Sequence, residues 1–173
     1  MKMKRMPLPY LVQAAVIAAI YAALTLLLAP ISYGAIQCRV AEVLTILPVF
    51  TPAAIPGLAV GCFISNLNIG ADPAGALDLL FGPLATLCAA ILTRWLRKYK
   101  IKGLPVLSAL PPVIFNALVV GAELTLMTQS TLPFEVNALY VGAGEFIACM
   151  IGGVILYTAL VRTGAGKRLF IIT

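Results

Sequence analysis

The sequence is dominated by apolar runs that have the length needed to cross a lipid bilayer. The first run, Tyr10 to Ala29, contains 20 residues and no charged side chain. About 20 residues of α-helix span the hydrocarbon core of a membrane. The run is longer than the apolar core of a typical signal peptide, and more apolar sequence follows it. We therefore expect it to be retained as the first of several membrane helices.

The composition excludes a soluble globular protein. Of the 173 residues, 62% are hydrophobic and only 10% are charged, and the mean hydropathy is +1.06. These values are typical of polytopic α-helical membrane proteins. The net charge of +6 does not indicate nucleic-acid binding, because the basic residues cluster at the ends of the apolar runs, as orientation signals do. The length fits one domain, residues 1–173.

The segment 39–69 decides the predicted topology. It is too long for one ordinary membrane span, and three prolines interrupt its middle. A hairpin broken near Thr51 to Ile55 places the basic stretch Arg94 to Lys102 on the same side of the membrane as the basic N-terminal residues. The positive-inside rule therefore favours the hairpin.

The predicted fold is all-α and polytopic, with six transmembrane helices and both termini cytoplasmic. In this topology every Lys and Arg except Arg39 lies at a cytoplasmic end, and every Asp and Glu lies on or within the outer half. The second helix, about 11 residues and roughly 17 Å long, is too short to span the hydrocarbon, so its outer end should lie inside the protein. The predicted helices are 9–28, 40–50, 54–69, 73–96, 104–128 and 137–161.

Polar side chains from the second to the sixth predicted helix converge at one depth, whereas the first helix contributes none. Ionisable residues inside a membrane are costly unless they pair or function. Arg39 can form a structural pair with a carboxylate such as Glu42. Four buried carboxylates, however, cannot all stay ionised beside one arginine without further cations or shifted pKa values. A cationic or donor-rich ligand would satisfy them. The candidate substrate-binding residues are Arg39, Glu42, Asn66, Asn68, Asp78, Asn116, Glu123 and Glu145.

The first helix instead carries two rows of alanines at four-residue spacing. Small residues at this spacing allow a second helix to approach closely, which drives helix association in lipid. The spacing does not distinguish a helix of this chain from a helix of a partner protein. The candidate partner-binding residues are Ala14, Ala18 and Ala22 in one row and Ala15, Ala19 and Ala23 in the other.

The sequence gives little support for an enzyme. It contains no histidine, which removes the commonest general base and metal ligand. Its four cysteines lack metal-ligand spacing, and no activated nucleophile is evident. We predict no catalytic residue, no metal site and no cofactor. Because no nucleotide-binding motif is present, energy from ATP has to come through a partner.

Three stretches of the sequence resemble the queuosine-precursor transporter family (QueT), and the resemblance covers essentially the whole chain. They are Gln37 to Pro48, with its arginine and glutamate three residues apart, Ile55 to Cys62 with Asn66 after it, and Asp78 followed by Gly82 to Thr86. Members of this family are substrate-binding S components of energy-coupling factor (ECF) transporters.

The resemblance implies an S component in the bacterial cell membrane that captures a 7-deazaguanine, such as the aminomethyl or cyano form, on its outer face. Uptake would require a transmembrane coupling protein and two ATPase subunits as partners. The alanine rows are similar to the AxxxA motif with which S components dock on the coupling protein.

The same resemblance suggests roles for the site residues. Glu145 or Asp78 would accept hydrogen bonds from the guanine edge, and Glu123 or Glu42 would hold an aminomethyl cation. Acceptor-rich sites discriminate strongly, because unmatched buried polar groups are costly. The neutral partners would be Asn66, Asn68 and Asn116, and the stacking residues Tyr33, Phe115 or Tyr140.

Two alternatives stay open. An S component for another vitamin or nucleobase would keep the fold and the alanine rows and would differ only in its pocket, and tight binding of riboflavin would favour it. A proton- or cation-coupled secondary carrier would use the carboxylates as relays. Its uptake would depend on the proton gradient and not on the ATPases.

Overall fold

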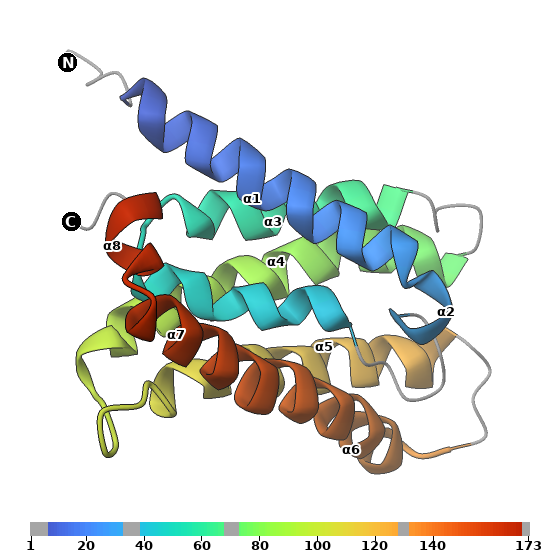
Figure 1. Ribbon diagram of the computed structural model, residues 1–173. Coiled ribbons are helices and arrows are strands. Elements are labelled where there is room, and N and C mark those ends of the chain that lie inside the picture. The colour runs from blue at the N-terminus through green and yellow to red at the C-terminus, as the bar shows by residue number, and fades with distance from the viewer. Residues whose placement is uncertain (1–6, 33–38, 68–72, 128–131, 171–173) are drawn as a thin grey trace, which may run out of the picture.

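The computed structural model describes residues 7–32, 39–67, 73–127 and 132–170, and within these ranges it contains helices and no strand (Figure 1). This result confirms the predicted all-α class. The elements in chain order are α1 (Leu8–Leu27), α2 (Ala29–Ser32), η1 (Val40–Val49), α3 (Ala54–Asn66), α4 (Pro73–Trp95), η3 (Leu96–Lys98), η4 (Leu107–Ala109), α5 (Leu110–Met127), α6 (Phe134–Glu145), η5 (Phe146–Gly152), α7 (Gly153–Arg162) and α8 (Ala165–Leu169).

Four helical segments in the described chain are long and apolar enough to cross a membrane. Two shorter apolar helices, η1 and α3, come between the first and the second of these segments along the chain. Six crossings, with both termini on the cytoplasmic side, stay a prediction. The four long segments are Leu8–Leu27, Leu77–Lys98, Leu107–Leu126 and Phe134–Arg162.

The hairpin between η1 and α3 is present, and the chain reverses direction at its turn (Figure 1). Within this turn the hydroxyl of Thr51 donates a hydrogen bond to Oε1 of Gln13 in α1, at 3.0 Å. The amide nitrogen of Gln13 donates to the backbone carbonyl of Leu169 in α8, at 3.0 Å. At the basic end of α4, Nη1 of Arg94 donates to the carbonyl of Pro48, at 2.9 Å. The start of α1, the hairpin turn, α8 and the basic end of α4 therefore lie at one end of the bundle.

The helix predicted at 40–50 is a 3₁₀-helix of ten residues rather than an α-helix. Its hydrogen bonds join residues three apart; the amide of Glu42, for example, donates to the carbonyl of Arg39 at 2.9 Å. With three residues per turn, side chains three apart lie on one line, so Glu42 and Thr45 are aligned, and Arg39 precedes them as the residue that caps the helix. A rise of about 2.0 Å per residue makes η1 roughly 20 Å long, which is longer than an α-helix of the same sequence.

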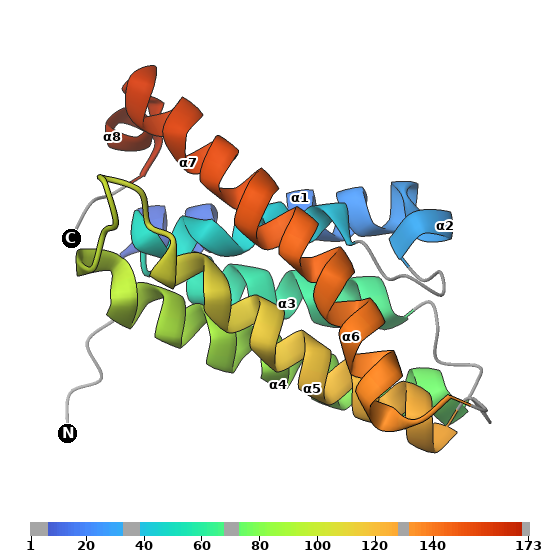
Figure 2. The ribbon, with the colours of Figure 1, turned by 90° about the horizontal axis from the view of Figure 1, so that it is seen from below.

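The last long helix, predicted as one segment at 137–161, is divided by the π-helical segment η5. Figure 2 shows α6 and α7 crossing the other helices obliquely. The end of η5 lies close to η1, because a Cβ on Gly152 would come within 2.7 Å of Cγ2 of Val43. π-Helical turns are frequent at functional sites, and this one faces η1, the helix that carries Glu42 and begins directly after Arg39.

Glycines of α3 allow α1 to pack closely against it. A Cβ on Gly57 would lie 2.7 Å from the carbonyl oxygen of Ala14, and a Cβ on Gly61 would lie 2.9 Å from the carbonyl oxygen of Ala18. Ala18 and Ala22 are accordingly buried. The first alanine row therefore packs within the chain, as small residues at this spacing allow.

The second alanine row has a different environment. Ala15, Ala19 and Ala23 are all exposed along α1. The structure thus separates two rows that the sequence presents as equivalent.

We predict that Gly61→Ala destabilises the protein. The added Cβ would lie 2.9 Å from the backbone of α1, so α1 has to shift, and overpacking of this kind costs about 1–3 kcal/mol. The midpoint of thermal unfolding of the detergent-solubilised protein should therefore fall below that of the wild type.

Gly142→Ala is the matched control. Its Cβ would meet only Cβ of Ala117, at 3.4 Å, and alanine favours a helix over glycine by about 1 kcal/mol. Equal unfolding midpoints for the two variants would contradict the close contact between α1 and α3.

Candidate binding site

A buried ion pair joins the start of η1 to α4. Nη2 of Arg39 donates to Oδ2 of Asp78 at 2.9 Å, and both residues are buried. Asn66, at the end of α3, donates its amide nitrogen to the backbone carbonyl of Asp78 at 2.9 Å. The sequence suggested Glu42 as the structural partner of Arg39, and the structure gives that role to Asp78.

Because Gly82 has no side chain, there is room for Asn66 and Asp78 to lie next to each other. A Cβ on Gly82 would lie 2.8 Å from the amide nitrogen of Asn66 and 2.8 Å from Oδ1 of Asp78. Either group would have to move to accommodate it. Gly82 therefore matters for the close approach of α3 and α4 at the ion pair.

Glu42 is buried where η1 faces α1. Its Oε1 accepts a hydrogen bond from the phenol of Tyr21, and the two residues are 1% and 0% exposed. The first helix was expected to contribute no polar group at this depth, and Tyr21 shows that this expectation was wrong. One signal was available in the sequence: Tyr21 lies three residues after Ala18 on the same helical face, and a buried tyrosine hydroxyl usually finds a partner.

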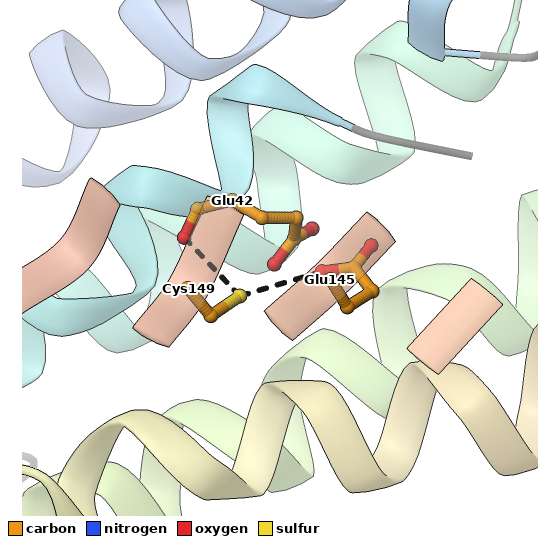
Figure 3. Close-up of side chains that lie close together, drawn as sticks. All are labelled: Glu42, Glu145 and Cys149. Atoms are coloured by element: carbon orange, nitrogen blue, oxygen red, sulfur yellow. Dashed lines mark hydrogen bonds between the residues drawn. The ribbon is translucent and has the colours of Figure 1, made fainter. Parts of the chain in front are cut away.

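Glu145 and Cys149 approach Glu42 from α6 and η5 (Figure 3). The thiol of Cys149 donates to Oε2 of Glu145 at 3.3 Å, and its sulfur lies 3.6 Å from the backbone carbonyl oxygen of Glu42. The hydroxyl of Thr45 donates to the same carbonyl at 2.6 Å. Side chains from two distant parts of the chain thus meet around the backbone carbonyl of Glu42.

Among the residues that the structure describes, Glu42, Glu145 and Cys149 form a group that could hold a cation. One ligand atom from each lies within 4.8 Å of the others, and all three residues are buried. Two carboxylates and a thiolate are donors that a divalent metal such as Zn²⁺ accepts, and two carboxylates alone can hold an organic ammonium group. Because Cys149 is already a hydrogen-bond donor to Glu145, the second arrangement leaves the existing contacts intact.

Helix α5 contributes two side chains to the cluster, one near Glu42 and Glu145 and the other near Asp78. Asn116 is within interaction distance of the carboxyl groups of Glu42 and Glu145. The carboxyl groups of Glu123 and Asp78 also lie within interaction distance of each other. Seven residues separate Asn116 from Glu123, which places them on one face of the helix, so α5 connects the two parts of the cluster.

Several buried acceptor oxygens of this cluster have no hydrogen-bond donor among the residues that the structure describes. Leaving one buried acceptor unpaired costs about 1–3 kcal/mol. The described cluster also contains four carboxylates and one arginine. A ligand that donates hydrogen bonds or carries positive charge would satisfy both deficits. The oxygens are Oε2 of Glu42, Oδ1 of Asn66, Oδ1 of Asp78 and Oε1 of Glu123.

The structure brings together all the described members of the predicted site. Asn68 and Tyr33 lie outside the described residues. Of the other two stacking candidates, Phe115 is half-buried and Tyr140 is exposed. The members that lie together are Arg39, Glu42, Asn66, Asp78, Asn116, Glu123 and Glu145, and the residues that the prediction did not include are Tyr21, Thr45, Gly82 and Cys149.

We predict that Asp78→Asn destabilises the protein. It removes the negative charge that pairs with Arg39 at 2.9 Å in a buried position. Breaking a buried ion pair by removing one partner costs about 3–5 kcal/mol. Thermal unfolding in detergent measures the effect. Glu135→Gln, at an exposed carboxylate in the first turn of α6, is the matched control, and equal losses for the two variants would contradict the importance of the pair.

Comparison with known proteins places this chain in a family. A family model described as QueT transporter matches residues 11–162, a range that includes the whole cluster. Searches among curated proteins and among solved structures gave no match.

Proposed function

The chain belongs to the QueT transporter family, and from this premise we propose that it is the substrate-binding S component of an ECF-type importer in the bacterial cell membrane. Transport rather than catalysis is the activity of the family. The long apolar helices make the chain a multi-pass membrane protein. The proposed substrate is a queuosine precursor, a 7-deazaguanine in its aminomethyl or cyano form, taken from an outward-facing site.

The unpaired buried acceptors are the observation that supports this substrate. A 7-deazaguanine presents a ring N–H and an exocyclic amine, and its aminomethyl form adds a primary ammonium group. The oxygens of Asn66 and Asp78 are acceptors suited to the guanine edge. Glu42 and Glu145 lie close enough together to hold the ammonium group between them. A ligand without donors would leave these buried acceptors unmatched, which disfavours it strongly.

The exposed row Ala15, Ala19 and Ala23 is the proposed docking surface for the transmembrane coupling protein. Of the two alanine rows, only this one is exposed along its whole length. Small side chains allow the partner helix to approach the backbone of α1. ATP hydrolysis by two ATPase subunits bound to the coupling protein would then drive uptake, because this chain has no nucleotide-binding motif of its own.

We predict that Glu145→Gln weakens binding of the aminomethyl deazaguanine by ten- to a hundredfold. The change removes one of the two carboxylates that face the ammonium group. A hydrogen bond to a charged group contributes about 1.5–3 kcal/mol, and each 1.4 kcal/mol is tenfold in Kd. Isothermal titration of the detergent-solubilised protein with the aminomethyl precursor, guanine and riboflavin measures the effect. Glu135→Gln is the matched control.

The outcomes of this titration are distinct. Tight binding of the deazaguanine that is weakened only by Glu145→Gln would support both the substrate and the site. Tight binding of riboflavin, or no purine binding by well-folded protein, would overturn the proposed assignment of a 7-deazaguanine as the substrate. Uptake that persists without the ATPases and collapses with the proton gradient would identify a secondary carrier instead.

We predict that Ala19→Leu weakens binding to the complex of coupling protein and ATPases at least tenfold and leaves deazaguanine binding unchanged. The larger side chain prevents close approach at the exposed row. Pull-down of the purified complex on immobilised protein measures the effect. Ala159→Leu, at an exposed position of α7, is the matched control. Equal binding by the two variants would show that the row is not the docking surface.

A further inference from the structure

The hydrogen bond between Tyr21 and Glu42 connects the helix that carries the exposed alanine row to the carboxylate pair. We propose that Tyr21 is a positioning residue that fixes Glu42 for the ligand and transmits ligand occupancy to the partner-facing side of α1. This proposal rests on the proposed function, because it assumes both a ligand at Glu42 and a partner at α1.

Tyr21 and the exposed row lie on opposite faces of the same helix. Residues two apart on an α-helix are separated by about 200° around its axis, so Tyr21 points away from both Ala19 and Ala23. The burial pattern agrees, because Tyr21 is fully buried while Ala19 and Ala23 are exposed. One helix therefore has one side in the candidate site and the other side available to a partner.

The two oxygens of Glu42 have different environments. Oε1 accepts the hydrogen bond from the Tyr21 phenol, whereas Oε2 has no donor among the residues that the structure describes. Hydrogen bonds to a carboxylate are roughly twice as strong as those between neutral groups. Tyr21 thus fixes one oxygen of Glu42 and leaves the other for the ligand, in a carboxylate that lies close to Glu145.

The contact between α1 and α3 leaves little space for Tyr21 to move independently of its helix. A Cβ on Gly61 would lie 2.8 Å from Cβ of Tyr21 and 2.9 Å from the carbonyl oxygen of Ala18. Close-packed interiors transmit displacement instead of absorbing it. A shift of Glu42 on ligand binding is therefore passed through Tyr21 to the backbone of α1.

Such a connection has a thermodynamic consequence. If the ligand changes the affinity for the partner by some factor, the partner changes the affinity for the ligand by the same factor. Removing the Tyr21 hydroxyl should reduce this factor toward one, because the ligand and α1 then no longer share a hydrogen-bonded residue.

Tyr21→Phe tests the proposal, because it removes the hydroxyl and keeps the ring in the core. Isothermal titration gives the Kd of the aminomethyl deazaguanine, and surface plasmon resonance gives the Kd of the purified complex of coupling protein and ATPases with and without that ligand. We expect about tenfold weaker ligand binding and a ratio of the two partner Kd values close to one.

Tyr10→Phe is the matched control. It lies on the same helix, and its phenol donates to the carbonyl of Pro52 at 3.3 Å, at the end of the bundle away from the carboxylates. This variant should keep the wild-type ligand Kd and the wild-type ratio.

The possible results separate the two proposals. The role of Tyr21 is overturned if the ratio of the partner Kd values with and without ligand is one in the wild-type protein. It is also overturned if this ratio is the same in Tyr21→Phe as in the wild type. In both cases the proposed function stands. Wild-type protein that binds no deazaguanine overturns the proposed function, and the role of Tyr21 with it.

Hydrogen exchange on the wild-type protein gives a second test that needs no variant. We expect the aminomethyl deazaguanine to slow exchange in peptides of α1 around Tyr21 as well as in η1. The proposal would be overturned if the ligand slowed exchange in η1 and in the segments from α4 to η5 but left the exchange rate of α1 peptides unchanged.

Discussion

The buried ion pair between Arg39 and Asp78 is the interaction on which the arrangement of the site depends. An arginine is costly inside an apolar bundle unless a carboxylate and further hydrogen bonds accompany it. Here the carboxylate comes from α4, an amide from α3 binds the backbone of the same aspartate, and a glycine one turn later leaves the space that both require. Three helices are thereby fixed relative to one another at the depth where the other polar groups lie.

The rest of the cluster is unbalanced, and this imbalance is what makes it a candidate for ligand binding. Once Arg39 is paired with Asp78, the carboxylates of Glu42, Glu123 and Glu145 lie nearby, and several acceptor oxygens lack donors among the described residues. A ligand that supplies donors and charge would stabilise the folded state by binding it preferentially. For a binding subunit, the same deficit provides affinity and selectivity, because ligands that lack the matching donors leave acceptors unpaired.

Two departures from α-helical geometry bring the carboxylates of Glu42 and Glu145 together. The 3₁₀ geometry of η1 aligns Glu42 and Thr45 along one line, and the π-helical η5 follows Glu145 and contains Cys149. The two segments pack where Gly152 has no side chain to keep Val43 away. Irregular helical turns of this kind recur at functional sites, since they direct side chains where a regular helix would not.

The sequence by itself determined the all-helical class, the hairpin between η1 and α3, and most members of the buried polar cluster. Apolar run length, proline position and the distribution of charge are local properties, and charged residues are so rare in this chain that each one inside an apolar run is informative. Only the tertiary structure decided the partners. Arg39 pairs with Asp78, 39 residues away, and Cys149 meets the backbone of Glu42 across 107 residues. It also decided that one alanine row is buried and that Tyr21 reaches Glu42. Spacing along the chain cannot show these contacts, because they depend on how helices with similar apolar surfaces are oriented against each other.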